Sequence, residues 1–364
     1  MAQLNDKTSV ARGTQAPSHV HEGWIDFARC VCALGVVLLH CFSGFAEGNP
    51  VPYVGEFRMV VWTALELVFG RFAVPVFFML TGYLLLNEKR SFDLAKLGRY
   101  AARIAALILI FGYPMNLVEL VSTGGSFTLG MLVEAFLLLL RGVSWGHMWY
   151  LYTLLGAYVI VPFLRAFAEQ SSRETYRSIL LVLGICTLFI PTVIRLFDIP
   201  SLLTSYIPIA TAAPFYLLLG DYERRYEPIS RSYIYAIGLG ALVLCLLFAA
   251  AYIFSAGHAS YALEDYANPL IALWALAVFQ FFRFEWRKNT LTANALHAIR
   301  FVSDNSLGLY ILHPVLLNGL YKGLGISPIT AFIGSFVIFW ALAVAFGLTL
   351  SWLLRRLPLF KRVL

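Results

Sequence analysis

The sequence predicts an all-α membrane protein, a polytopic bundle of about ten transmembrane helices with both termini in the cytoplasm. Three observations lead to this prediction. The chain of 364 residues is 60% hydrophobic and only 13% charged, whereas a soluble domain carries about 25% charged residues. Its apolar residues gather in runs long enough to cross a hydrocarbon core of about 30 Å, at about 1.5 Å per residue. Its basic residues also alternate between loops as a membrane topology requires.

Ten apolar runs have the length of a membrane-spanning helix. They lie near residues 25–46, 59–87, 99–120, 147–166, 177–198, 205–220, 233–255, 267–283, 303–321 and 330–354. The sixth is short and contains Pro208 and Pro214, so we expect it to be broken or tilted where protein surrounds it. The run at 128–140 is only about 13 residues long, a length typical of an interfacial segment, and we expect it to lie on the outer surface.

The basic residues give the orientation of these spans. With the N-terminus inside, the predicted cytoplasmic segments hold 20 of the 27 Lys and Arg residues and three more fall within spans. The outer loops hold four, which are Arg58, Arg141, Arg195 and Lys322. Cytoplasmic loops are enriched in Lys and Arg, so this bias supports both the number of spans and their direction. The net charge of +7 therefore belongs to a membrane topology, and no basic patch with interleaved aromatics indicates nucleic acid.

The chain divides into one membrane domain with two tails. Residues 1–23 are polar and predict a disordered cytoplasmic tail, residues 24–355 form the membrane domain, and residues 356–364 form a basic cytoplasmic tail. Arg29 interrupts the first apolar run and no small-residue cleavage pattern follows, so we expect the first helix to remain as an anchor. The five cysteines lie in apolar runs without metal-ligand spacing. They are expected to be packing residues, and no metal site is predicted.

An ionisable residue at membrane depth is costly and by default marks a functional site. Arg29 and His40 are eleven positions apart, a spacing that returns to nearly the same helix face about 16 Å further along. The pair predicts one wall of a channel, with Arg29 near the cytoplasm and His40 deeper in the membrane. The structural alternative is that Arg29 extends to lipid headgroups and His40 bonds a neighbouring helix.

Two further sets of polar residues lie near mid-membrane. Arg71 is followed by Pro75, which would free a backbone carbonyl for it to bond; that structural role is one alternative to a place in the site. Tyr310 and His313 share one helix face at a spacing of three. For His313, a role in packing one helix against another is an equally good interpretation.

Polar residues also mark the two mouths of the bundle. Arg99 and Arg103 lie one turn apart at the predicted cytoplasmic end of the third span, where their guanidinium groups suit phosphates. Ordinary cytoplasmic flanking charges explain them almost as well. At the outer end, an aromatic belt accounts for most of His147, Trp149, Tyr150 and Tyr152, although His147 fits a belt less well. The signatures of soluble enzymes, such as a phosphate-binding glycine loop or a nucleophile elbow, are absent from the sequence.

Taken in order, these motifs resemble those of the membrane acyltransferase 3 family of bacterial O-acyltransferases. The likeness rests on the Arg29 and His40 spacing, RFAVPVFFMLTGYLLL from residue 71, the Arg99 and Arg103 pair, HMWYLYTLLGAYVIVPFLR from residue 147, and LGLYILHP from residue 307. It covers nearly the whole chain.

The resemblance implies an activity and a set of roles. An acyl group, usually acetyl, would move from cytoplasmic acyl-CoA to a hydroxyl of an extracytoplasmic or lipid-linked glycan, with an exopolysaccharide repeating unit favoured. His40 would be catalytic, Arg29 its partner toward the donor, and Arg99 and Arg103 contacts to coenzyme A. Arg71, Tyr310 and His313 would complete the catalytic group, and His147 and Trp149 would lie on the acceptor side. The expected location is the bacterial inner membrane, with acyl-CoA as a substrate and no permanently bound cofactor.

Two other functions fit parts of the pattern. A secondary transporter or flippase for an anionic or lipid-linked sugar would also use many spans, a broken helix and buried Arg and His residues. Its expected paired halves with matching interrupted spans are not evident in the sequence. A noncatalytic scaffold of a polysaccharide machine would leave the mid-membrane Arg and His residues unexplained. Transport moves a substrate unchanged, whereas acyl transfer makes a new ester, so the two are separable by experiment.

Overall fold

The computed structural model describes residues 22–42, 55–90, 93–124, 126–199, 211–227, 230–286, 290–326 and 335–364, and within these ranges the chain is helical with no strands. The longer α-helices are α1 (Gly23–Phe42), α2 (Glu56–Phe69), α3 (Ala73–Leu85), α4 (Leu94–Leu107), α5 (Tyr113–Gly124), α6 (Leu129–Leu140), α7 (Trp149–Gln170), α8 (Arg173–Gly184), α11 (Ala213–Arg225), α12 (Arg231–Ala256), α14 (Pro269–Glu285), α15 (Ala293–Asn318) and α16 (Phe336–Leu354). Short elements are η1 (Ile108–Gly112), η2 (Gly146–Met148), η3 (Ile185–Phe189), α9 (Ile190–Leu196), α13 (Tyr261–Glu264), η5 (Gly319–Gly323) and α17 (Pro358–Val363).

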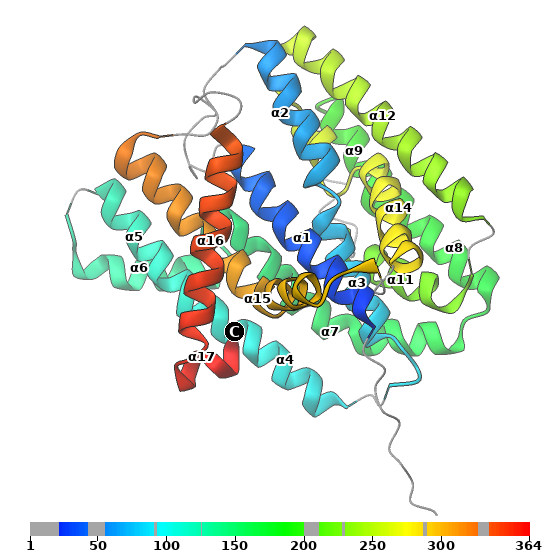
Figure 1. Ribbon diagram of the computed structural model, residues 1–364, viewed down its shortest axis with the longest axis horizontal. Helices are drawn as coiled ribbons and strands as arrows, with labels where there is room; N and C mark the ends of the chain where they lie inside the picture. Colours follow the sequence, from blue (N-terminus) through cyan, green and yellow to red (C-terminus); the bar gives the residue numbers. More distant parts are fainter. Residues whose placement is uncertain are drawn as a thin grey trace, which may run out of the picture.

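Helix α1 runs through the middle of the bundle (Figure 1) and packs against α3, α15 and α16. On one side of it, α2, α12 and α14 lie together; on the other, α15 and α16 pack against each other, and the α5–α6 hairpin lies beyond them. Helix α1 is apolar around much of its circumference because it is enclosed by neighbours, and Ala28, Cys32 and Val37 on it are fully buried.

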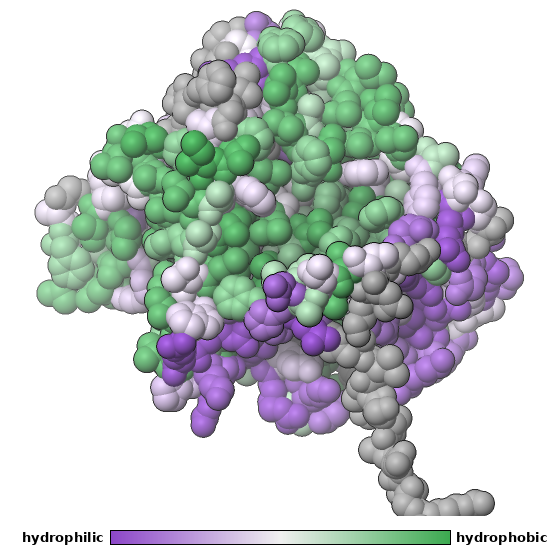
Figure 2. Space-filling view, in the orientation of Figure 1, coloured by the Kyte–Doolittle hydropathy of each residue, from purple (hydrophilic) through white to green (hydrophobic). Residues whose placement is uncertain are grey.

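The surface has the hydropathy of a membrane protein. Apolar residues cover most of the visible side, and hydrophilic residues gather toward one end (Figure 2). That end carries Arg99, Arg173, Arg231 and Arg355 at the starts of α4, α8 and α12 and the end of α16; we call it the basic face, and the opposite end, where α7 begins, the far face. By the positive-inside rule we expect the basic face to be cytoplasmic.

In the part of the chain that the structure describes, eight helical segments are long and apolar enough to cross a membrane: Gly23–Cys41, Glu56–Leu85, Leu94–Gly124, Gly146–Gln170, Arg173–Leu196, Arg231–Ala256, Tyr261–Glu285 and Phe336–Leu354. The prediction of a polytopic helical bundle is confirmed. The other two predicted spans correspond to α11, which has 13 residues, and to α15, which has 26 residues but carries more polar side chains. The count of ten therefore stays a prediction, and residues 200–210 of the sixth span lie outside the described residues.

The second span is broken at the position of a buried arginine. The carbonyl oxygen of Glu66 accepts from the backbone N–H groups of both Gly70 and Arg71, each at 2.8 Å, and α2 ends at Phe69. Helix α3 begins at Ala73, so Pro75 falls in its first turn, where a missing N–H costs little. The alternative in which Arg71 bonds a carbonyl freed by Pro75 is not seen, because Arg71 pairs with carboxylates instead.

Helices α3 and α11 approach each other more closely than any side chain would allow. A Cβ on Gly82 would lie 1.9 Å from the carbonyl oxygen of Leu217, and one on Gly220 would lie 2.0 Å from that of Met79. Small residues of this kind let membrane helices pack backbone to backbone. The contact fixes α3, which lines the site, against the rest of the bundle.

The remaining expectations about local structure have mixed outcomes. Helix α6 has 12 residues, about 18 Å, which is too short to cross a bilayer. The predicted C-terminal tail instead contains α17, which folds back against α4. The cysteines are free and four of them are buried, while Cys186 is half-buried. The predicted N-terminal tail lies outside the described residues except for its last two positions.

Candidate active site

Two histidines from opposite parts of the chain meet in the bundle. His40 lies near the end of α1 and His313 is fully buried on α15. The Nδ1 atom of His40 is 2.7 Å from Nε2 of His313, and the two rings are nearly parallel. Pro314 follows His313 and has no N–H to give to the preceding turn. The carbonyl of Leu309 in that turn is bonded by Nδ1 of His313 at 2.8 Å.

These contacts indicate which nitrogen of each ring carries the proton. A carbonyl oxygen can only accept, so Nδ1 of His313 carries a proton and donates it to Leu309. In the neutral state of His313, Nε2 is then an acceptor, and His40 must donate to it from Nδ1. A neutral His40 therefore has its lone pair on Nε2. This is the tautomer that a general base requires.

His40 lines a cavity of about 690 Å³, which we call the vestibule; residues at the start of α7 also line it, so it lies toward the far face. Aromatic and polar side chains surround it. Its lining includes Arg71, His147, Trp149, Thr153, Arg195, Tyr216, Tyr261, Glu264, Asp265 and Tyr266. A cavity of this size with convergent polar groups is typical of a small-molecule or sugar site.

Arg71 lies in the vestibule wall within a buried ion-pair cluster. Its Nη2 atom is 2.7 Å from Glu66 and 3.2 Å from Glu264, and all three side chains are at least 86% buried. The side chain of Thr63 donates to Glu264 at 3.0 Å. Neither carboxylate was singled out in the sequence, although Glu66 is an acid within an apolar run, the same signal that Arg71 gives.

A second cavity, of about 380 Å³, is lined by Arg355 at the end of α16 and therefore lies toward the basic face; we call it the basic cavity. Arg29, Arg103 and Arg355 line it together with Tyr150 and Tyr310. Arg103 donates to the main-chain oxygens of Val363 and Leu364, each at 2.7 Å, so the segment around α17 covers part of this cavity. Arg355 was not anticipated, because its position after the last span is also that of an ordinary flanking charge.

The two cavities adjoin at Val74, and Arg29 and His40 do not line one cavity as the single channel predicted. Arg29 lines the basic cavity and His40 lines the vestibule, although both are on α1. Val74 lines both cavities. Between them, the ring of Tyr150 lies 5.1 Å from that of Phe78 and 5.5 Å from that of Tyr310. The helical period places Arg29 and His40 on one helix face correctly, but the packing of these aromatic side chains separates their cavities.

The other predicted residues are distributed as follows. His147 and Trp149, expected on the acceptor side, both line the vestibule. The hydroxyl of Tyr310 donates to the carbonyl of His147, and the ring of His147 lies 6.1 Å from that of His313. Arg99, expected to contact the donor, is 69% exposed on α4 and does not line the basic cavity. Tyr150, which an aromatic belt would place at the membrane surface, instead lies between the cavities.

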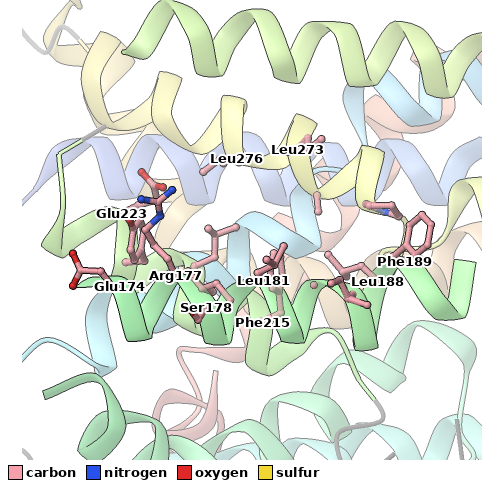
Figure 3. A pocket seen from close by; sticks show the side chains of 17 residues that line it. Glu174, Arg177, Ser178, Leu181, Leu188, Phe189, Phe215, Glu223, Leu273 and Leu276 are labelled. Carbon is pink, nitrogen blue, oxygen red and sulfur yellow. The ribbon is translucent and has the colours of Figure 1, made fainter. Parts of the chain in front are cut away.

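A larger groove of about 940 Å³ lies elsewhere on the bundle, between α8, η3, α11 and α14 (Figure 3). Glu174, Arg177 and Glu223 lie at one end of it, and Phe189 lies at the other. Its walls are otherwise mainly apolar, and none of the predicted catalytic residues lines it. Size alone therefore does not identify the reaction site, since the histidines lie at the vestibule.

The fold and the site define an integral membrane protein with a buried histidine pair at one of two adjoining cavities. The family model of the acyltransferase domain matches residues 22–356, nearly the whole chain. The chain belongs to this family and is a membrane acyltransferase that acts on sugars. The predicted family is thereby confirmed. A search of curated proteins and a search of solved structures found no significant match. Within the described ranges, no three or more His, Cys, Asp or Glu side chains are grouped to hold a metal.

Proposed function

We propose that this protein is an O-acyltransferase of the bacterial inner membrane. It moves an acyl group, acetyl in the first instance, from cytoplasmic acyl-CoA to a hydroxyl of an extracytoplasmic glycan, an exopolysaccharide repeating unit. The observation that carries the proposal is the position of His40. It lines the vestibule, its tautomer is set by His313, and a cavity with three arginines lies directly behind it.

The basic cavity is the proposed donor site. Coenzyme A carries several phosphates, which guanidinium groups bind through paired hydrogen bonds. Arg29 and Arg355 line the cavity, and Arg103 becomes available when the segment around α17 moves aside. A volume of about 380 Å³ suits the extended pantetheine arm, with the nucleotide outside at the face of the membrane. The thioester would then reach His40 past Tyr150 and Val74.

The proposed chemistry is direct transfer with His40 as general base. Nε2 of His40 takes the proton of the acceptor hydroxyl as the hydroxyl oxygen forms a bond to the carbonyl carbon of the thioester. The tetrahedral intermediate then collapses, the carbon–sulfur bond breaks, and His40 returns the proton to the leaving thiolate. The products are a sugar ester and free coenzyme A. While His40 is protonated, the hydrogen bond from Nδ1 to His313 becomes charge-assisted, so His313 stabilises the intermediate.

Complementation of a null strain tests the proposal. The strain receives wild-type protein, His40→Ala, or His297→Ala at equal membrane levels, and the ester content of its surface glycans is measured by NMR. His297 is a matched control because it is exposed on α15 and lines neither cavity. We expect full ester content with wild type and His297→Ala, and a loss of about 10²- to 10⁴-fold in transfer rate with His40→Ala. An unchanged glycan in the null strain would exclude the proposed acceptor, and full activity of His40→Ala would exclude the proposed base.

A further inference from the structure

We propose that the vestibule accepts an uncharged sugar residue and discriminates against uronates. The inference rests on the proposed function, because it names the class of acceptor for the same site. It depends on two features of the vestibule wall, its exposed aromatic rings and the pairing of its charges.

Aromatic side chains give the vestibule a surface for the apolar face of a sugar ring. The rings of Trp149 and Tyr266 are stacked with their centroids 5.5 Å apart, and both line the cavity. Trp149 is 40% exposed and Tyr261, further along the wall, is 70% exposed. The hydroxyl of Tyr216 holds Tyr266 through its carbonyl oxygen. Large rigid rings of this kind bind a ligand face at low entropic cost.

Each cation in the described vestibule wall is already paired with a carboxylate. Arg71 is bonded by Glu66 and Glu264, and Arg195 is bonded by Asp265. Two arginines and two carboxylates therefore line the cavity, and Glu66 lies behind Arg71 as a third acid. The cluster is neutral when Glu66 is protonated and carries one net negative charge when Glu66 is ionised.

Within the described residues, no other Lys or Arg lines this wall. The segments 43–54, 200–210 and 327–334 contain no Lys or Arg. The other three basic residues predicted to be outside are Arg58, Arg141 and Lys322, and none of them lines the vestibule. The guanidinium group of Arg58 lies over the ring of Trp62, and Lys322 pairs with Glu119. A sugar carboxylate would have to displace an existing partner of Arg71 or Arg195, or lie beside acids.

Sugar hydroxyls match the same wall without this conflict. Ionised carboxylates accept several hydrogen bonds each, and Glu264 and Asp265 both line the cavity. Hydroxyl groups donate to such oxygens, whereas a uronate placed beside them is repelled in a partly desolvated site. We expect a ratio of at least about tenfold in kcat/KM in favour of the uncharged sugar, since like charges in contact commonly cost more than that.

The test compares two acceptors that differ only at C6. Purified protein in nanodiscs is given labelled acetyl-CoA with a methyl hexoside or the matching methyl hexuronoside, and with envelope glycan from the null strain. Asp265→Asn leaves Arg195 without its carboxylate partner and keeps a side-chain oxygen for the backbone N–H of Ala267. Glu119→Gln is the control, because it removes an acid paired with Lys322 outside the vestibule.

The expected result is labelling of the hexoside at least tenfold faster than the hexuronoside, with the ratio lowered in Asp265→Asn and unchanged in Glu119→Gln. Equal or faster labelling of the hexuronoside by wild type overturns the inference and leaves the acyltransferase activity in place. If only the glycan is labelled, NMR of the product decides: an ester on an uncharged ring supports the inference, and an ester on a uronate overturns it. No labelling of any acceptor overturns the proposed function itself.

Discussion

Replacement of His313 by Leu tests whether this residue acts only through His40. His313 lines neither cavity, so neither substrate touches it. Its Nε2 atom accepts from Nδ1 of His40 at 2.7 Å, and that bond becomes charge-assisted when His40 takes up the proton. A hydrogen bond involving a charged group contributes about 1.5–3 kcal/mol. Its loss in the transition state corresponds to a decrease of about 10- to 150-fold in kcat.

The assay measures kcat and KM for transfer of labelled acetyl from acetyl-CoA to glycan by protein in nanodiscs. We expect His313→Leu to lower kcat with little change in KM for either substrate. His313→Gln retains an acceptor near Nε2 and should recover part of the activity. His297→Ala, an exposed histidine on the same helix, should behave as wild type.

Stability is measured alongside, because His313→Leu leaves the Nδ1–H of the half-buried His40 without this acceptor, at a cost of up to about 1–3 kcal/mol. Rates are therefore compared per folded protein, from thermal unfolding in the same nanodiscs. A decrease confined to KM, or full activity of His313→Leu, would refute the tautomer argument. So would an equal loss in His297→Ala.

Three further predictions concern stability and are checked by thermal unfolding in nanodiscs. Arg71→Leu leaves Glu66 and Glu264 without their cation and should cost about 3–5 kcal/mol, while changing both acids to Gln as well should recover most of it; no recovery would contradict the ion-pair account. Gly82→Ala should destabilise the protein by about 1–3 kcal/mol or more, because the added Cβ would meet the backbone of α11. Gly240→Ala should be tolerated, because a Cβ there meets nothing within 4 Å. Burial opposes ionisation of Glu88, but the hydrogen bond from Arg224 prevails and lowers the pKa of Glu88 from 4.5 to about 2. Ionised Glu88 therefore contributes fully to the free energy of unfolding above pH 4.5, and this contribution is lost as the pH falls through about 2. Glu88→Gln should flatten the dependence of stability on pH in this acid range; an acid dependence identical to that of wild type would contradict this.

The architecture and one half of the site were predictable from local patterns in the sequence. Apolar runs of sufficient length predicted the membrane helices. The helical period placed Arg29 and His40 on one helix, as α1 shows. The position of His147 and Trp149 at the start of one span predicted their place at the end of the bundle where the vestibule lies.

The partners of these residues were not predictable, because a local period contains no information about distant contacts. His40 and His313 are 273 positions apart, and Arg71 and Glu264 are 193 apart. The separation of the two cavities depends on the side-chain packing of Tyr150 against Phe78. The position of the segment around α17 depends on hydrogen bonds from Arg103 to main-chain oxygens. Every residue has such an oxygen, so the sequence does not indicate which ones Arg103 will bond.

The break between α2 and α3 connects the packing of the bundle to the geometry of the site. The turn at Gly70 and Arg71 lets the arginine reach Glu264 of α13 instead of following the face set by α2. Helix α3 then starts afresh and is held against α11 by a contact at Gly82 that only glycine permits. The same helix supplies Val74, which lines both cavities. The boundary between the vestibule and the basic cavity therefore depends on the contact of α3 with α11, and we expect a change at Gly82 to alter transfer even when both histidine rings are intact.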